Sequence, residues 1–286
     1  MSATGQLKPE TAAAIDLPAY TTLALELDAE VATVSLNRPD KANSMNAEMW
    51  TELQACFEWL DAEPGVRVVV LAGNGKHFCA GIDLGMFGSV VGGQAAEAGR
   101  RHEQLRQTIL RMQGNLSAIE KCRKPVLAAM HYTCIGGALD MTSCCDMRYC
   151  SADAYFSIKE IELGMTADVG TLQRLPKLIG DGMVRELAYT GRQFDAEEAQ
   201  QIGFVNRVYP DRESLLTGVT AIARDIAAKA PLAVRGTKEM IVYARDHSVA
   251  DSLNYIATWN AGMLSQADLM GSVEAQMKGE SIVYDD

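Results

Sequence analysis

Two glycine turns each follow an apolar segment, and their residues are suited to binding an oxygen atom that gains negative charge. The first is residues 77–83 (HFCAGID) and the second is residues 134–138 (CIGGA). Glycine lets the backbone approach a ligand closely, and a helix that begins at such a turn offers unpaired N–H groups. The N–H groups of Ile82 and Gly137 are therefore candidates for an oxyanion hole. The alternative is that these glycines only make tight turns.

Three acidic residues follow the second turn: Asp140, Glu160 and Asp168. Asp140 lies in an otherwise small and apolar segment, where a buried carboxylate is costly unless it is bonded. The alternative for Asp140 is an acid favoured by the dipole of a helix N-terminus. Glu160 shares one face of an expected strand with Glu162 beside Lys159, which is the pattern of a solvated sheet edge. Asp168 could cap the helix that follows it.

Cysteine and histidine spacing gives no sign of a metal site or a nucleotide cofactor. The seven cysteines form no C-x-x-C pair and the four histidines form no H-x-x-x-H pair. We expect the cysteines to be reduced, and we expect Cys144 and Cys145, which follow an apolar stretch, to pack in the core. Neither glycine turn matches G-x-x-x-x-G-K-[ST] or G-x-G-x-x-G, so phosphate-binding loops are not indicated.

The bulk composition is that of a globular protein without a membrane or nucleic-acid function. The 286 residues are 48% hydrophobic and contain no apolar run near the roughly 20 residues that span a bilayer. The net charge of −11 argues against binding to nucleic acid, which needs clustered Lys and Arg. The first residues lack the pattern of a targeting segment, so we expect a cytoplasmic location.

The apolar periodicity predicts an α/β core that precedes a helical region, and this core would position the two turns. Residues 1–18 are expected to be a loose tail, 19–195 the core with the active site, and 196–286 a helical region. The expected core elements are a hairpin at 21–39, a helix at 46–60, a buried strand at 66–73, a loop at 81–99, a helix at 100–120, a buried strand at 126–130, a helix at 135–145, and strands at 147–151 and 154–158. Helices are then expected at 212–230, 232–246 and 249–279, with Pro231 as a break.

Four segments, in this order, resemble the crotonase (enoyl-CoA hydratase/isomerase) superfamily. They are residues 37–43 (NRPDKAN), 78–84 (FCAGIDL), 135–140 (IGGALD) and 170–175 (GTLQRL). The chain is more closely similar to the dienoyl-CoA isomerases of that superfamily, through residues 145–150, 166–180 and 245–255. In hydratases the position of Asp140 usually holds Glu and that of Asp168 usually holds Gly, so the three acids favour the isomerases. Ala138 departs from the glycine that is common at its position.

The resemblance implies a fold and an activity. The fold would be a right-handed spiral of ββα units with a C-terminal helical trimerisation region, giving a homotrimer or a homohexamer. The activity would be conversion of 3,5-dienoyl-CoA to 2,4-dienoyl-CoA in fatty acid β-oxidation, with the coenzyme A thioester as substrate and without a metal or other cofactor. An enoyl-CoA hydratase is the alternative, and a non-catalytic binding protein on the same scaffold is an alternative of another class.

The resemblance also implies roles for individual residues. Glu160 would be the base at carbon 2 and Asp168 the acid at carbon 6, although these two roles could be exchanged. Asp140 would set the polarity of the site by hydrogen bonding, and Ile82 and Gly137 would bind the thioester oxygen. The expected substrate-binding residues are Ala42, Ala80, Asp83, Leu84 and Gly136.

Overall fold

The computed structural model describes residues 15–86, 88 and 97–285, and its core is built on one six-stranded sheet. Parts of the predicted tail (1–14) and of the predicted loop (87 and 89–96) lie outside the described residues. The strand order is β1-β2-β3-β4-β6-β9, in which only β1 and β2 pair antiparallel. The strands are β1 (Leu23–Asp28), β2 (Val31–Leu36), β3 (Val68–Gly73), β4 (Val126–Met130), β6 (Met147–Ser151) and β9 (Arg207–Tyr209).

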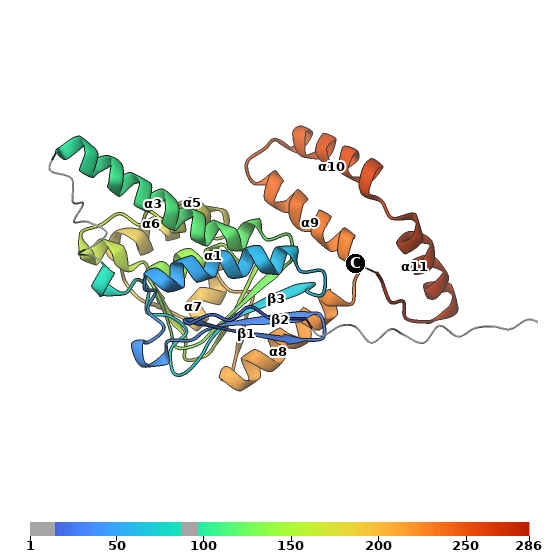
Figure 1. Ribbon diagram of the computed structural model, residues 1–286, viewed down its shortest axis with the longest axis horizontal. Helices are drawn as coiled ribbons and strands as arrows, with labels where there is room; N and C mark the ends of the chain where they lie inside the picture. Colours follow the sequence, from blue (N-terminus) through green and yellow to red (C-terminus); the bar gives the residue numbers. More distant parts are fainter. Residues whose placement is uncertain (1–14, 87, 89–96, 286) are drawn as a thin grey trace, which may run out of the picture.

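Helices cover both faces of this sheet (Figure 1). On one face α1 (Ala47–Ala62) packs against α3 (Ala98–Lys121), and on the other α8 (Arg212–Ala227) packs against β3 and β6. This arrangement explains the uninterrupted apolar sequences of β3 and β4, which are buried along their whole length. The helix predicted at 46–60 is confirmed, and Asn46 caps α1 by accepting a hydrogen bond from the Met49 N–H.

A second, three-stranded sheet lies between the main sheet and the second glycine turn along the chain. It consists of β5 (Thr133–Ile135), β7 (Tyr155–Ser157) and β8 (Phe194–Asp195), with β5 and β7 parallel and β7 and β8 antiparallel. β5 follows β4 after two residues and leads directly into α4 (Gly137–Ser143). The second glycine turn therefore stands between a strand and a helix, as the sequence predicts.

Short helices and helical turns complete the core. They are η1 (Pro39–Lys41), η2 (Leu84–Met86), η3 (Lys159–Leu163), α5 (Thr171–Arg174), η4 (Leu175–Lys177), α6 (Asp181–Thr190) and α7 (Ala196–Gln201). Three of these lie at predicted site residues. η2 contains Leu84, η3 contains Glu160, and α5 begins three residues after Asp168.

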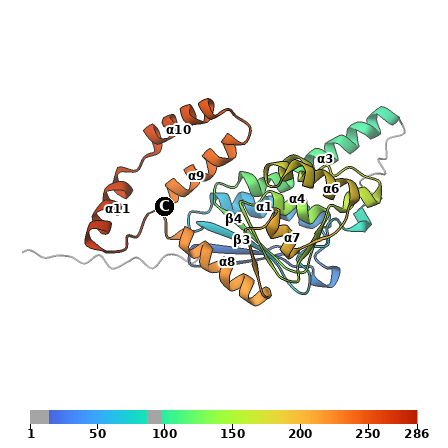
Figure 2. The same cartoon turned by 180° about the vertical axis from the view of Figure 1, so that it is seen from behind.

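The C-terminal region is mostly helical, but it is not separate from the core throughout. Beyond residue 196, β9 extends the main sheet and α8 covers its second face. The last helices, α9 (Pro231–Ala244), α10 (Val249–Met263) and α11 (Gln266–Lys278), project to one side of the core in both views (Figures 1 and 2). Within the described residues, no helix combines the length and apolar character that crossing a bilayer requires.

The prediction of a single helix over 249–279 is wrong. The helix ends at Met263, Leu264 is extended with φ −66° and ψ 110°, and α11 begins two residues later. The Ser265 side chain accepts a hydrogen bond from the Asp268 N–H at 3.1 Å and so caps a new helix. Helical apolar spacing continues across this break, which is why periodicity alone does not reveal it.

Candidate active site

The two glycine turns lie in direct contact. The backbones of Cys79 and Cys134 form a short parallel β-bridge, in which the Cys79 N–H donates a hydrogen bond to the Thr133 carbonyl at 2.9 Å. A Cβ atom added to Gly81 would lie only 2.7 Å from the Ile135 carbonyl oxygen. Because Gly81 also has φ +85°, glycine is required there for both its space and its conformation.

The N–H groups of Ile82 and Gly137 are adjacent and have no acceptor among the residues that the structure describes. A Cβ atom built on Gly137 would lie 3.6 Å from the Ile82 nitrogen, so the two turns present these N–H groups to the same small space. Gly137 is the first residue of α4, where no intrahelical acceptor exists. Two neighbouring unpaired donors are the geometry that an oxyanion requires.

A cavity of about 540 Å³ opens beside these donors. All residues predicted for the site line it except Ala42: Ile82, Gly137, Asp140, Glu160, Asp168, Ala80, Asp83, Leu84 and Gly136. Ala42 instead supports the wall, since its carbonyl accepts a hydrogen bond from the Ala80 N–H at 3.0 Å. The wall also contains Trp50, Met112 and Val169, which sequence reasoning did not place there, because their apolar character is equally typical of core residues.

Asp140 is the most buried of the three acids, with 1% of its surface exposed. Its Oδ1 accepts a hydrogen bond from the Thr171 N–H at 2.6 Å, whereas its Oδ2 is buried without a partner among the described residues. Burial and the charge of Asp168 raise the pKa of Asp140 to about 6, against the opposing effects of the Thr171 hydrogen bonds and the charge of Arg174. The carboxylate thus bonds to the next helix, α5, and not to the start of its own.

Glu160 does not lie on a strand, so that prediction is wrong. It is the second residue of η3, which ends at Gly164 with φ +72°. Lys159 pairs with Glu162, and Glu160 turns into the cavity, with its Oε1 3.3 Å from where a Cβ on Gly136 would be. Burial, followed by the charges of Asp140 and Asp168, raises the pKa of Glu160 to about 7.

Asp168 also lines the cavity, on the loop before α5. The alternative that it caps this helix is wrong, because the residue at the N-cap is Gly170 and no side chain bonds there. Its backbone carbonyl accepts a hydrogen bond from Gln113 Nε2 of α3 at 2.6 Å, which fixes the loop. Burial raises the pKa of the Asp168 carboxyl as well.

The cavity therefore combines two unpaired N–H donors with three acids that hold protons at unusually high pH. Such a site can stabilise an enolate while one carboxylate removes a proton and another carboxyl returns one. All seven cysteines are free and buried, which confirms the core packing predicted for Cys144 and Cys145. In the described part of the chain, no cluster of three or more His, Cys, Asp or Glu side chains is arranged to hold a metal ion.

Comparison with known proteins gives consistent matches. The family model described as enoyl-CoA hydratase/isomerase matches residues 26–277. The human mitochondrial Delta(3,5)-Delta(2,4)-dienoyl-CoA isomerase is 47% identical over 251 residues, which is 87% of this chain and 76% of that protein. The peroxisomal enzyme of the same name from Arabidopsis thaliana is 46% identical, covering 87% of this chain and 91% of its own.

Solved structures agree with these matches. The crystal structure of enoyl-CoA hydratase from Bacillus anthracis superposes with a TM-score of 0.84 at 30% identity, covering 93% of this chain and 99% of that one. The fold predicted from the sequence motifs is therefore confirmed. The trimerisation attributed to the C-terminal helices stays a prediction, since a single chain does not test it.

Proposed function

The chain belongs to the enoyl-CoA hydratase/isomerase family, and we propose that it converts 3,5-dienoyl-CoA to 2,4-dienoyl-CoA. One observation carries this proposal: a single cavity holds the free N–H groups of Ile82 and Gly137 together with Asp140, Glu160 and Asp168. The names of the human and Arabidopsis relatives support the choice of substrate.

The reaction needs charge stabilisation at one end of the substrate and a proton at the other. A proton on carbon 2 lies between the thioester carbonyl and the diene, so its removal gives an anion spread from the carbonyl oxygen to carbon 6. The N–H groups of Ile82 and Gly137 hold that oxygen, and precedents put the loss of one such donor at about 2.7 to 4 kcal/mol. The substrate's own carbonyl acidifies carbon 2, so we propose no further cofactor.

We propose a separate role in the reaction for each of two acids. Glu160 lies against Gly136, next to the oxyanion donor Gly137, and carbon 2 is bonded to the carbonyl carbon. Glu160 therefore takes the proton from carbon 2, and the double bonds move from carbons 3 and 5 to carbons 2 and 4. Asp168, which also lines the cavity, gives its proton to carbon 6. The enzyme is ready again once Glu160 has lost its proton and Asp168 has gained one.

Raised pKa values bring both carboxyl groups closer to neutral pH, where a carboxyl can both release and take up a proton. A pKa of about 7 leaves a substantial fraction of Glu160 ionised at pH 7 and makes it a stronger base than an ordinary glutamate. Burial favours the protonated form of Asp168, which the return of a proton requires. Asp140 faces both acids and opposes their simultaneous ionisation by charge repulsion.

Enoyl-CoA hydration is a second candidate, because the similar Bacillus anthracis structure is named as a hydratase. A hydratase would use Asp140 and Glu160 around a water molecule. The carboxyl of Asp168 has no part in that reaction, yet it lines the cavity. The third acid is the reason to prefer isomerisation.

The test is a parallel assay of the purified protein with 3,5-dienoyl-CoA, 3-enoyl-CoA and 2-enoyl-CoA. We expect rapid formation of the conjugated 2,4-diene, followed by its ultraviolet absorbance. Asp168→Asn should lower kcat for the dienoyl substrate by about 10²- to 10⁴-fold, while the exposed Asp181→Asn on α6 serves as the matched control. Hydration of 2-enoyl-CoA without dienoyl turnover would favour the hydratase, and no turnover of any substrate would favour a binding protein.

We also propose a homotrimer or homohexamer and a cytoplasmic location. Neither α10 nor α11 has a buried residue in the single chain. Apolar side chains such as Leu253 and Met277 are exposed on them, which is typical of an interface. Light scattering after size-exclusion chromatography tests the assembly. Fractionation of the source cells tests the location, and the relatives named above are described as mitochondrial and peroxisomal.

A further inference from the structure

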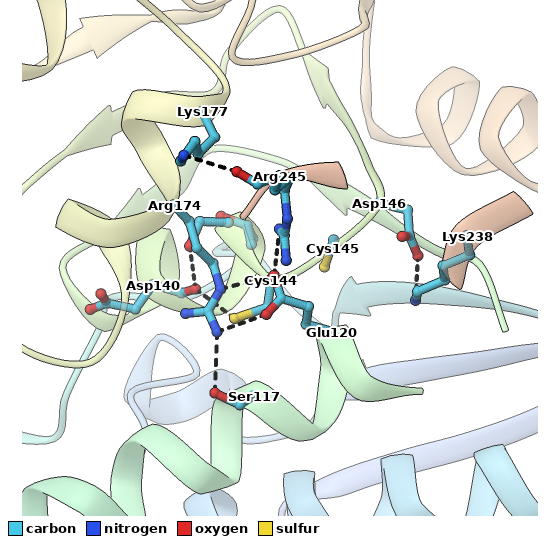
Figure 3. A network of polar contacts seen from close by, with 12 residues as sticks. Ser117, Glu120, Asp140, Cys144, Cys145, Asp146, Arg174, Lys177, Lys238 and Arg245 are labelled. Atoms are coloured by element: carbon cyan, nitrogen blue, oxygen red, sulfur yellow. Dashed lines mark hydrogen bonds and ion pairs between the residues drawn. The ribbon is translucent and has the colours of Figure 1, made fainter. Parts of the chain in front are cut away.

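A network of charged side chains lies beside Asp140 and joins three separate helices (Figure 3). Arg174, the last residue of α5, donates to both carboxylate oxygens of Glu120 on α3, at 3.2 Å each. Its guanidinium also donates to Ser117 Oγ at 3.1 Å. Arg245, at the end of α9, donates to the same Glu120 carboxylate at 2.7 Å.

Arg174 is held in a tightly defined place. A Cβ atom on Gly170 would lie 2.0 Å from Arg174 Nη1, so the guanidinium packs against bare glycine backbone with φ +140°. The pair of Arg174 with Glu120 is largely buried, with 14% and 18% of the two side chains exposed. A planar guanidinium that bonds both oxygens of a carboxylate fixes direction as well as distance.

The anchored helix is a single turn, and its two ends have different partners. Its first residue, Thr171, donates its N–H to Asp140 Oδ1 at 2.6 Å, and its last residue is Arg174. One turn of four residues is too short to be stable alone, so its position depends on what holds its ends. The contacts of Arg174 on α3 therefore determine where the Thr171 N–H meets Asp140.

The charges around Asp140 also indicate that Arg174 acts on this acid. Glu160, Asp168 and Arg174 all interact electrostatically with Asp140, and Arg174 is the cation among them. Glu120 stays ionised as the partner of Arg174: its burial would raise its pKa, but Arg174 and Arg245 more than offset this and lower the pKa. Cys144, also near Arg174 and Asp140, stays a neutral thiol because burial raises its pKa far above neutrality.

We propose that Arg174 is a positioning residue for the isomerase reaction: it holds the Thr171 N–H on Asp140 and supplies the cation facing the acid cluster. Glu120 and Arg245 link this anchorage to α9, since Arg245 shares the Glu120 carboxylate and its backbone carbonyl accepts a hydrogen bond from Lys177 Nζ at 3.1 Å. The reaction named in this inference rests on the proposed function, whereas the anchorage itself does not.

The kinetic test compares Arg174→Met with Arg174→Lys, and uses Arg185→Met on α6 as the control for loss of an exposed arginine. We expect Arg174→Met to lower kcat for 3,5-dienoyl-CoA about 10²-fold, the scale for a misplaced catalytic group, with KM within about twofold. Its acid limb in the pH profile of kcat/KM should move to higher pH, because loss of the cation raises the pKa values of the acids. Arg174→Lys should lower kcat but leave the limb in place.

A second measurement needs no activity. Hydrogen–deuterium exchange by mass spectrometry should show faster exchange in the peptide that contains Thr171 for Arg174→Met, and unchanged exchange for Arg185→Met. Arg245→Met should accelerate exchange in the same peptide to a smaller extent. Should Arg174→Met fail to fold, Glu120→Gln keeps the shape of the anchor without its charge and is expected to accelerate the same exchange.

The outcomes separate the two proposals. Wild-type protein without dienoyl turnover would refute the proposed function, while the exchange data would still decide the anchorage. Active wild-type protein with Arg174→Met equal to Arg185→Met in kcat, pH profile and exchange would overturn the role of Arg174 and leave the proposed function intact.

Discussion

The pKa of Glu160 has a consequence for the stability of the protein. Because its pKa is raised in the folded state, folded protein holds this proton to higher pH than unfolded protein does. The stability associated with the protonated form is therefore complete below pH 4.5 and is lost as the pH rises through about 7. We predict that Glu160→Gln, which mimics the neutral acid, removes this loss.

The size of the effect follows from the two pKa values. The ordinary value is 4.5 and that of Glu160 is about 7. At about 1.4 kcal/mol for each pKa unit, ionising Glu160 costs the folded state about 3 kcal/mol. Linkage then gives a stabilisation by Glu160→Gln of roughly 1 kcal/mol at pH 5 that grows to about 3 kcal/mol at pH 8.

Urea unfolding at fixed protein concentration measures this difference at pH 5, 6, 7 and 8. The fixed concentration matters because association of subunits adds to the apparent stability. The exposed Glu58→Gln on α1 is the control for replacing a surface glutamate by glutamine. If Glu160→Gln raises the free energy of unfolding no more at pH 8 than at pH 5, then burial and nearby charges do not raise the pKa of Glu160, and the reasoning is refuted.

Three further predictions concern the site and the packing of the core. Asp140→Asn removes a negative charge that raises the pKa of Glu160, so the acid limb of kcat/KM should move to lower pH in the absorbance assay. Gly81→Ala would place a Cβ 2.7 Å from a backbone carbonyl at φ +85°, and should cost about 2 kcal/mol in urea unfolding and lower kcat by separating the two turns. Lys238→Met breaks a 2.7 Å ion pair with Asp146, whose side chain is 24% exposed; unfolding free energy should fall by about 2 kcal/mol, less than for a fully buried pair.

Much of the fold could be predicted from apolar periodicity. The buried strands β3 and β4 and the apolar face of α1 were readable because each has a single uninterrupted pattern. The break at Ser265 was not, since helix periodicity is the same on both sides of it. The incorporation of β9 into the sheet was also missed, because a three-residue strand is too short to show alternation.

The candidate site shows the limit of local reasoning more sharply. Asp140, Glu160 and Asp168 each had an ordinary local explanation; that for Glu160 assumed a strand which does not form, and that for Asp168 assumed a helix cap which Gly170 occupies instead. Glu160 was expected on a strand edge beside Lys159. In the structure both residues lie in η3, and Lys159 forms its ion pair with Glu162 instead. Motif order suggested that the acids act together, whereas only the packing of α4, η3 and the loop before α5 places them in one cavity.

The arrangement of these acids is unfavourable for stability and is best explained by chemistry. Asp140 is almost fully buried, one of its oxygens lacks a partner in the described structure, and it interacts electrostatically with two further acids. Burying such a group costs free energy, and replacement by an apolar side chain of similar size would remove that cost. A proton that must leave one carbon and return four carbons away requires acids with raised pKa values, and burial with mutual repulsion is how a protein raises them. The same features that weaken the fold at Asp140 are therefore the ones that proton transfer in this cavity requires.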